Sequence, residues 1–469
     1  MKESRIIRTP PDHTRACERS LEPSTPLQPL IIPRPEHTLS RAQISPAALK
    51  VLYRLHEAGY RACLVGGGVR DLLLGREPKD FDIATDARPE QVHKLFRNAR
   101  LIGRRFRLAH VQFGAEIIEV ATFRAHGTDS EDGDGAVVEQ AEDGRILSDN
   151  VYGSIEEDAW RRDFTLNALY YDIANFAVLD YVGGLTDLRA GLIRLIGDPL
   201  QRYREDPVRM LRAVRFAAKL GFRLDPATEA PLPRFGHLLE KIPPARLFEE
   251  VLKLFLGGCA LQSFELLRHY RLFGWLFPAT ERCLSHQQQH YPKTLLARTL
   301  ASTDERLAAG LSTHPAFLFA ALLWEPLRER WHRLEDEGMD GSEALQAAAD
   351  AVIQAQLRHT ALPRRYSLPM REIWEMQPRL AAITGKRPLR LLSHPRFRAG
   401  YDFLLLRAEA DEQAAELARW WTGFLALDDT GRAIATQPPA KAPAAGKSKS
   451  RRRRKARASA TDATPPAES

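Results

Sequence analysis

The sequence is poor in the residues that mark several common protein classes. Its four cysteines, Cys17, Cys63, Cys259 and Cys283, are scattered over 469 residues and form no CxxC pair. This spacing argues against a disulfide framework and a cysteine zinc site, so a reducing, cytoplasmic location is the simplest interpretation. No apolar run approaches the roughly 20 residues that cross a bilayer. The first residues, MKESRIIRTPPDHTRACERS, also lack the apolar core of a secretory signal.

Two familiar nucleotide-binding loops are missing as well, although residues 66–68 are three consecutive glycines. A P-loop has Lys-Ser or Lys-Thr after its glycines, whereas Val69, Arg70 and Asp71 follow here. A dinucleotide fingerprint has its third glycine at the spacing GxGxxG, where this chain has Asp71. What remains is a short strand, a glycine turn, a short helix and a second strand that carries D-x-D.

The chain has an excess of positive charge, +8 at neutral pH. Such charge favours a polyanionic partner, either nucleic acid or an anionic membrane surface. Part of it lies in the terminal segment KAPAAGKSKSRRRRKARASATDATPPAES, which has almost no large apolar residue. This tail cannot form a core, so we expect residues 429–469 to be disordered and to attract phosphates without regard to sequence.

The order of the expected elements predicts an α+β head followed by an all-α region. Residues 1–38 are proline-rich and polar, and we expect them to be disordered. Strands and helices alternate over residues 39–195, where Ser45 and Pro46 begin a helix that Gly59 ends. The acidic stretch at residues 131–144 is expected to be a mobile loop. From about residue 196 the pattern becomes helical, and the tryptophans of AAELARWWTGFLAL are expected in the core.

The D-x-D pair, Asp80 and Asp82, is a candidate metal site. Residues i and i+2 of a strand face the same side, and two adjacent carboxylates repel each other unless a cation lies between them. Hard, oxygen-liganded Mg²⁺ fits, and two such ions could activate a hydroxyl and stabilise pyrophosphate. Gly67 and Gly68 would let backbone N–H groups approach a triphosphate, and Arg70 could add charge. The alternative is an ordinary pair of surface carboxylates.

A third carboxylate is expected at the metal site. In EIIEVATFR, Glu119 would lie on the same face of the strand as Ile117 and Phe123. A carboxylate among apolar residues is costly unless it faces a cation. The alternative is an edge-strand glutamate that faces water. Arg124 follows within reach of the same site.

The segment DAWRRDFTLNALYYD concentrates polar groups just before an apolar stretch: Asp158, Arg161, Arg162, Asp163 and Asn167. Arg162 could neutralise phosphate. Asp163 could bind ribose hydroxyls or add negative charge for metal. A capping aspartate beside a surface arginine pair is the alternative interpretation.

The segment REDPVRMLRAVRFAAKLG is predicted to be a helix that begins at Asp206 and Pro207. At 100° per residue, four basic side chains fall within an arc of about 120°: Arg209, Arg212, Arg215 and Lys219. A basic stripe opposite the core face is often present only for solubility. Its position after RRDFT makes nucleotide or RNA the favoured partner.

These motifs together resemble the class II nucleotidyltransferase family, which contains bacterial poly(A) polymerases and CCA-adding tRNA nucleotidyltransferases. The resemblance rests on GGGVRDLLLG with KDFD, RRDFTLNAL and REDPVRMLRAVRFAAKLGF. It covers residues 50 to 260 strongly and the helical remainder more loosely. GRRFRLAHVQFG, VYGSIEEDAWRRDF, HPRFRAGYDFLLLRAE and the basic tail favour the poly(A) polymerase branch.

The resemblance implies a DNA-polymerase-β-like nucleotidyltransferase head at residues 39–195. A helical neck at 196–260 would bind nucleotide and RNA, and a body and leg at 261–428 would bind RNA. It implies template-independent addition of AMP to RNA 3′ ends, with ATP as substrate and two Mg²⁺ ions held by Asp80 and Asp82. Asp206 and Arg209 match the family's base-selecting pair, and Asp163 matches a catalytic or ribose-binding residue. Glu119 and Asp163 both remain candidates for the third carboxylate.

The expected partners are RNA 3′ ends and ATP, with a monomeric protein and a basic tail that could also contact RNA-decay proteins. Two alternatives remain at this point. A CCA-adding enzyme would perform the same chemistry on tRNA. A non-catalytic RNA-binding protein on the same fold would have lost the carboxylates, which are intact here.

Overall fold

The computed structural model describes residues 28–103, 107–125, 139–140, 146–148, 151–286, 295–409 and 411–437. Most of the expected acidic loop, the N-terminal segment before residue 28 and the tail after residue 437 lie outside these ranges. The chain divides into two compact units, residues 1–374 and residues 375–469. Across the described residues, no helix is both long enough and apolar enough to cross a membrane.

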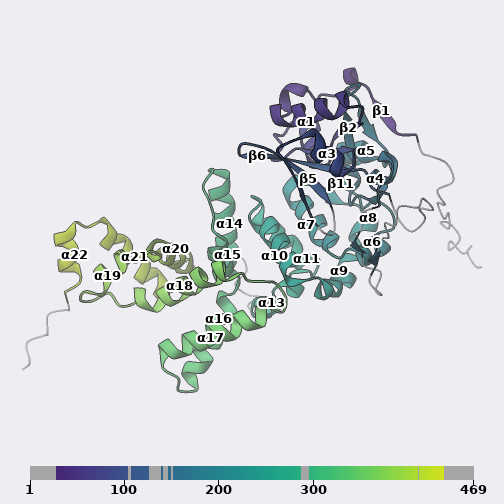
Figure 1. The fold of residues 1–469 in the computed structure, drawn as a ribbon. Helices are drawn as coiled ribbons and strands as arrows, with labels where there is room; N and C mark the ends of the chain where they lie inside the picture. Colours follow the sequence, from purple (N-terminus) through teal and green to yellow (C-terminus); the bar gives the residue numbers. More distant parts are fainter. Residues whose placement is uncertain are drawn as a thin grey trace, which may run out of the picture. The chain divides into compact units, whose positions relative to one another are not determined.

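An eight-stranded mixed sheet forms the core of the head (Figure 1). Strand β3 pairs with β6 in parallel, and the other neighbours pair antiparallel. In spatial order the strands are β1 (Leu30–Ile32), β10 (Val178–Asp180), β9 (Leu169–Asp172), β2 (Ala62–Val65), β3 (Asp82–Thr85), β6 (Glu116–Thr122), β5 (Leu108–Phe113) and β4 (Ala99–Ile102). The predicted α+β head with a mixed sheet is therefore confirmed.

The first helix of the head begins and ends where its capping residues predict. In α1 (Pro46–Glu57) the Ser45 hydroxyl accepts a hydrogen bond from the Ala48 N–H at 3.1 Å, and Gly59 follows the helix with a φ of +86°. The other head helices are α2 (Gly67–Leu73), α3 (Pro89–Leu95), α4 (Ile155–Arg161) and α5 (Gly184–Ala190). Two small sheets accompany them, β7 (Glu139–Gln140) with β8 (Ile146–Ser148) and β11 (Leu192–Ile193) with β12 (Arg223–Leu224).

Residues 28–38 are structured, although the composition suggested otherwise. Strand β1 lies at the edge of the large sheet, with Leu30 opposite Asp180, and Ile32 is buried. The prediction that all of residues 1–38 are disordered is therefore wrong for residues 28–38. Backbone pairing with β10 holds this edge strand, and only Ile32 of its three residues is buried, so the composition gave little sign of it.

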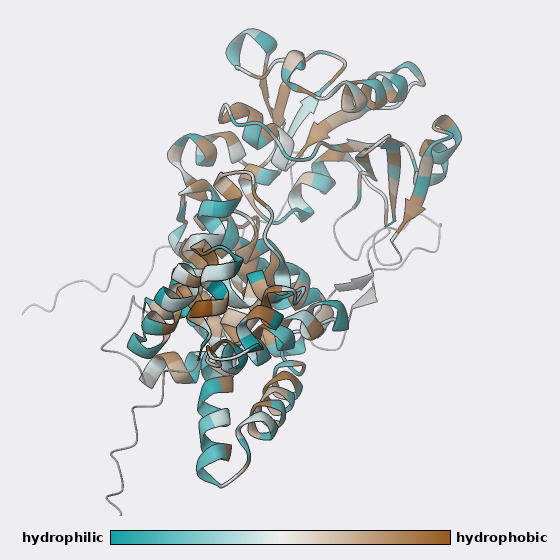
Figure 2. Cartoon of the chain, turned by 90° about the vertical axis from the view of Figure 1, so that its left-hand side faces the viewer, coloured by the Kyte–Doolittle hydropathy of each residue, from teal (hydrophilic) through white to brown (hydrophobic). Residues whose placement is uncertain are grey.

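The second half of the first unit is helical, as predicted (Figure 1). Its helices are α6 (Pro199–Glu205), α7 (Val208–Leu220), α8 (Pro226–Glu229), α9 (Leu232–Phe235), α10 (Pro244–Phe255), α11 (Ala260–His269), α12 (Phe273–Leu276), α13 (Pro278–His286), α14 (Leu295–Ala308), α15 (Pro315–Leu322), α16 (Trp324–Asp336) and α17 (Gly341–Gln356). Figure 2 shows hydrophobic and hydrophilic residues alternating along many helices, which is the pattern of amphipathic helices around a core.

The second unit has a small core of its own. It comprises the end of α18 (Arg364–Leu380), α19 (Arg387–Leu392), α20 (Phe397–Ala408), α21 (Glu412–Ala426) and α22 (Asp429–Ala435). Trp421 is fully buried and its Nε1 donates to the Leu380 carbonyl at 2.9 Å, which confirms the predicted core role for this residue. Trp420 is only partly buried and packs against the same core. Helix α22 also corrects the expectation of disorder from residue 429, because the Asp428 carboxylate caps it by accepting from the Gly431 N–H.

Candidate active site

The D-x-D pair lies where the chain enters the sheet after α2. Asp82 is the first residue of β3 and is half-buried, whereas Asp80 lies two residues earlier in the loop and is exposed. Strand alternation therefore does not apply to Asp80, and the prediction that one strand aligns both side chains is wrong. Their charges nevertheless interact, because Asp80 is one of the groups that shift the titration of Asp82.

Negative charge is concentrated around Asp82. Burial raises the pKa of its carboxyl from the ordinary value of 3.8 to about 6, with Glu119 and Asp80 adding to the rise and Arg162 opposing it. A half-buried carboxylate with this excess of negative charge suits a divalent cation. Within the described ranges no three His, Cys, Asp or Glu side chains converge as a ready-made metal cluster.

Glu119 lies directly beside Asp82, because the parallel pairing of β3 and β6 sets these two residues opposite each other. Its side chain is half exposed and approaches the ring of His110 on β5, at 3.2 Å between Oε1 and Nε2. The buried residues of β6 are Ile118, Val120 and Thr122, so Glu119 belongs to the open face. The expectation of a costly carboxylate among apolar neighbours is wrong, although the strand register does bring Glu119 to the pair.

The glycine turn owes its shape to Gly66, which the sequence analysis did not single out. Gly66 has φ +72° and ψ −131°, a conformation that favours glycine, and it precedes the first turn of α2. Gly67 and Gly68 are helical, and their first-turn N–H groups have no carbonyl within the helix to bind. A Cβ on Gly68 would lie 3.5 Å from the Asp80 carbonyl oxygen, so the turn packs on the aspartate loop.

Arg162 is held beside this turn by a buried carboxylate. Asp158, which is 1% exposed in its side chain, accepts from Arg162 at 2.8 Å, from Arg161 at 2.7 Å and from the Tyr170 hydroxyl at 2.8 Å. These cations keep the pKa of Asp158 well below its usual range despite its burial. The Nη1 atom of Arg162 lies 3.7 Å from the position of a Cβ on Gly66. The arginine is therefore fixed with one edge toward the glycine turn.

Asp163 is held by hydrogen bonds on both carboxylate oxygens. Its Oδ1 accepts from the Phe164 N–H at 2.8 Å and from Asn167 at 3.1 Å, and its Oδ2 pairs with Arg212 at 2.5 Å. The Arg212 charge and these bonds outweigh burial and lower the pKa of Asp163 to about 2. The carboxylate is thus ionised and aimed at α7 within this network.

Arg70 occupies a buried position between two elements of the site. It pairs with Asp71 at 2.7 Å, donates to the Asn167 Oδ1 at 2.6 Å and lies over the ring of Phe216. Arg124 is also buried, and its backbone N–H donates to Asp158 at 3.4 Å. Both predicted arginines therefore lie beside the site residues and are held there by contacts with other protein groups.

The basic stripe of α7 faces carboxylates of the protein, and most of it is not a solvent face. The four residues are Arg209, Arg212, Arg215 and Lys219, of which Arg209 is buried and Lys219 is exposed. Their carboxylate partners are, in the same order, Glu205, Asp163, Glu250 and Asp71. The helical wheel did locate one basic side, but tertiary packing places acidic residues of the head, of α6 and of α10 against it.

The residues matched to base selection lie next to each other at the start of α7, with separate partners. Asp206 accepts from Arg246 at 2.6 Å and from the Val208 N–H at 3.3 Å, while Arg209 binds Glu205. Sequence reasoning missed Arg246 because nothing in PPARLFEE marks it. It also missed Tyr170, the hydroxyl partner of Asp158, because an apolar strand surrounds it.

Three family models match the chain in the order of this architecture. They are the poly A polymerase head domain at residues 62–194, the probable RNA- and SrmB-binding site of polymerase A at 221–284, and the arginine-rich C-terminus of polymerase A at 337–458. The curated poly(A) polymerase I of Salmonella typhi is 53% identical over 84% of this chain and 86% of its own length. The chain belongs to the bacterial poly(A) polymerase family. As a member it is a nucleotidyltransferase that adds adenosines to RNA.

Further relatives place the family within a wider group. The poly(A) polymerase I of Haemophilus influenzae is 48% identical over 83% of the chain and 87% of its own length. A CCA-adding enzyme of Bacillus subtilis is 40% identical but covers only 48% of the chain and 54% of its own length. The crystal structure of the Bacillus stearothermophilus CCA-adding enzyme with CTP aligns with a TM-score of 0.53 and 27% identity, over 83% of this chain and 87% of that one.

Proposed function

We propose that this member of the poly(A) polymerase family transfers AMP from ATP to RNA 3′ ends without a template and releases pyrophosphate, by two-metal-ion catalysis. The observation that carries the chemistry is the half-buried Asp82 beside the glycine turn, whose pKa is raised by burial and further by the negative charges of Glu119 and Asp80. Phosphoryl-transfer catalysis requires mainly positioning and charge stabilisation, and this arrangement offers both.

Asp80 and Asp82 would hold the Mg²⁺ ions, with Glu119 as the third carboxylate because it lies opposite Asp82 in the sheet. When bound, Mg²⁺ would lower the pKa of the RNA 3′-hydroxyl and stabilise the departing pyrophosphate. The Arg162 edge near Gly66 would add positive charge beside the triphosphate. Asp163 has both oxygens bonded to the protein, which favours a role in positioning Arg212 and Asn167 over direct metal binding.

Selection of adenine would depend on Asp206 and Arg209, the pair that matches the family's base-reading residues. A carboxylate accepts from the adenine amino group, and a guanidinium donates to a ring nitrogen, so such a pair can read a Watson–Crick edge without a template. Their present partners, Arg246 and Glu205, fix both side chains at the start of α7.

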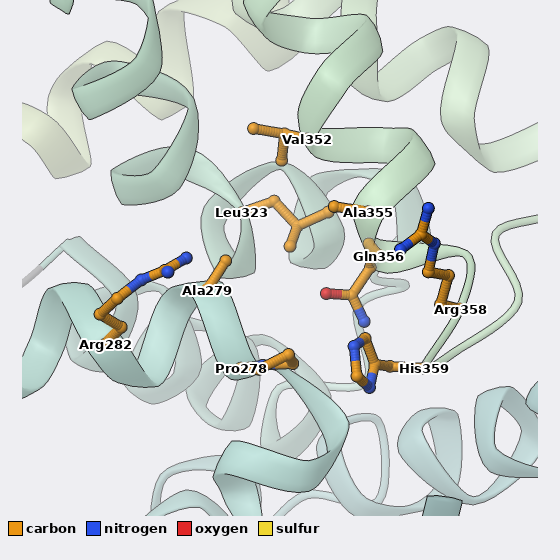
Figure 3. A pocket seen from close by; sticks show the side chains of 9 residues that line it. All are labelled: Pro278, Ala279, Arg282, Leu323, Val352, Ala355, Gln356, Arg358 and His359. Atoms are coloured by element: carbon orange, nitrogen blue, oxygen red, sulfur yellow. The ribbon is translucent and has the colours of Figure 1, made fainter.

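Binding of RNA outside the head would use cations of the helical region. A cavity of about 290 Å³ has an apolar wall that includes Leu323 and Val352, with Arg282 on one side and Arg358 and His359 on the other (Figure 3). Among the residues that the structure describes, none of those lining the cavity is acidic. Guanidinium groups beside an apolar surface suit the phosphates and bases of single-stranded RNA.

The test is incorporation of labelled ATP into a short unstructured RNA, with Asp80→Ala as the inactive variant. Long adenosine tails on the wild-type product and their loss in the variant are the expected results. Near-normal activity of Asp80→Ala would contradict the assignment of Asp80 as a Mg²⁺ ligand. Incubation with tRNA, CTP and ATP separates the CCA-adding alternative, because such an enzyme would stop after two C and one A.

A further inference from the structure

A buried arginine, Arg202, links the segment that carries Asp163 to the helix that carries Arg209. Arg202 lies in α6, is 4% exposed, and was not selected by any sequence pattern. Its Nη2 donates to the carbonyl oxygens of Arg161 at 2.7 Å and Arg162 at 2.6 Å. These two carbonyls end α4, where unpaired acceptors and the helix dipole favour a cation.

The other edge of the same guanidinium reaches the start of α7. The Nη1 of Arg202 donates to the Glu205 Oε2 at 2.8 Å, and Arg209 donates to the same oxygen at 3.0 Å. Arg209 also donates to the backbone carbonyl of Arg202 at 2.8 Å. A continuous chain of hydrogen bonds therefore joins the end of α4 to the base-reading residue of α7.

Stability alone does not explain this arrangement. Burial and the like charge of Arg209 lower the pKa of Arg202 to about 10. Its Nε is buried without a hydrogen-bond partner among the described residues. A buried cation with an unmatched donor is costly, and buried ion pairs are often no more stabilising than apolar side chains of similar volume. A requirement for fixed geometry explains the arrangement better.

We propose that Arg202 is a positioning residue that keeps the Arg162–Asp163 segment in register with Asp206 and Arg209, and thereby couples nucleotide selection to nucleotidyl transfer. The inference rests on the proposed function. Arg202 acts through the backbone at the end of α4 and through Glu205, and Asp163 is close enough to contribute to its electrostatic environment.

The test compares Arg202→Met with Arg204→Met in the full-length protein. Methionine fills a similar volume, and Glu205 keeps its bond to Arg209, so no buried carboxylate loses its last partner. Arg204 is the matched control because it lies in the same helix, is exposed and has its ring contact with Phe235. For Arg202→Met we expect kcat/KM with ATP to fall about 10- to 100-fold, since small misplacements cost this much.

The decisive measurement is the ratio of kcat/KM for ATP to that for CTP, supported by the Kd ratio of the two nucleotides without RNA. Arg202→Met should lower the kinetic ratio about tenfold, and Arg204→Met should leave it at the wild-type value. Arg202→Lys should restore part of it, since an ammonium keeps the charge but lacks the planar fork.

If Arg202→Met folds and keeps the wild-type ratio of kcat/KM for ATP to that for CTP, the proposed coupling is overturned. This holds even if the activity with both nucleotides falls, because Arg202 would then have only a structural role. If Arg202→Met does not fold, as judged by circular dichroism, Arg202→Lys decides, and a wild-type ratio there overturns the proposal. A wild-type protein that adds no adenosine to RNA contradicts the proposed function instead, so the two failures are distinguishable.

Discussion

Replacement of Asp82 by asparagine should stabilise the metal-free protein while it abolishes activity. The raised pKa of Asp82 means that the folded protein disfavours the ionised carboxylate. For an acid with a raised pKa, this penalty is fully present above the folded value, near pH 6, and disappears as the pH falls below the ordinary value of 3.8. Asparagine carries no charge, so the variant removes the penalty.

The size of the effect follows from the two pKa values. The difference between 3.8 and about 6 corresponds to an upper limit of about 3 kcal/mol in the free energy of unfolding at pH 8. Because Asp82 is half-buried, solvent screening should reduce the observed gain to about 1–2 kcal/mol. Roughly half of the gain should remain at pH 5, since the folded carboxyl is then mostly protonated while the unfolded one is mostly ionised.

The assay is urea unfolding of both proteins in EDTA at pH 8 and pH 5, with Asp80→Asn as the control. Asp80 is exposed, so its removal should change stability less. Added Mg²⁺ should stabilise the wild type more than Asp82→Asn, because a ligand that binds the folded state raises its stability. A variant that is less stable than wild type at pH 8, or one whose gain does not depend on pH, would refute the reasoning about uncompensated charge.

Three further outcomes are expected. Asp158→Asn should lower the free energy of unfolding by about 3–5 kcal/mol in urea titrations, because two largely buried guanidiniums lose their carboxylate. Gly184→Ala should cost about 1–3 kcal/mol, since its Cβ would overlap a backbone carbonyl, whereas Gly423→Ala, in a helix with open space, should be neutral or slightly stabilising. A variant that carries both Arg282→Glu and Arg358→Glu should bind RNA more weakly, and its RNA affinity should depend less on salt, in filter-binding assays. Its KM for ATP should be unchanged.

Local patterns predicted most of the elements in this protein because the relevant signals are short in range. Ser45 and Gly59 mark the ends of α1, and β-branched and aromatic runs coincide with β5 and β6. Trp421 of α21 was correctly assigned to a core for the same reason. The N-terminal β1 was missed because its pairing partner, β10, lies about 150 residues away in the chain.

The candidate site shows the same division between local and distant information. The carboxylates and arginines could be named from their spacing, and the resemblance to class II nucleotidyltransferases gave them an order of importance. Their partners could not be named, because Arg246 binds Asp206 from 40 residues away and Arg212 binds Asp163 from 49 residues away. A helical wheel locates the basic side of α7, but only packing shows that acidic side chains cover it.

The sequence by itself determined the chemical groups available, the α+β head and the family to which the chain belongs. The tertiary structure alone decided that Glu119 lies beside Asp82 and that Gly66 shapes the turn. It also decided that Arg202 connects the segment of Arg162 and Asp163 to the start of α7, a link that no pattern in the sequence shows. The physical reason is that sheet register, burial and shared hydrogen-bond acceptors arise between segments distant in the chain, where periodicity and capping signals carry no information.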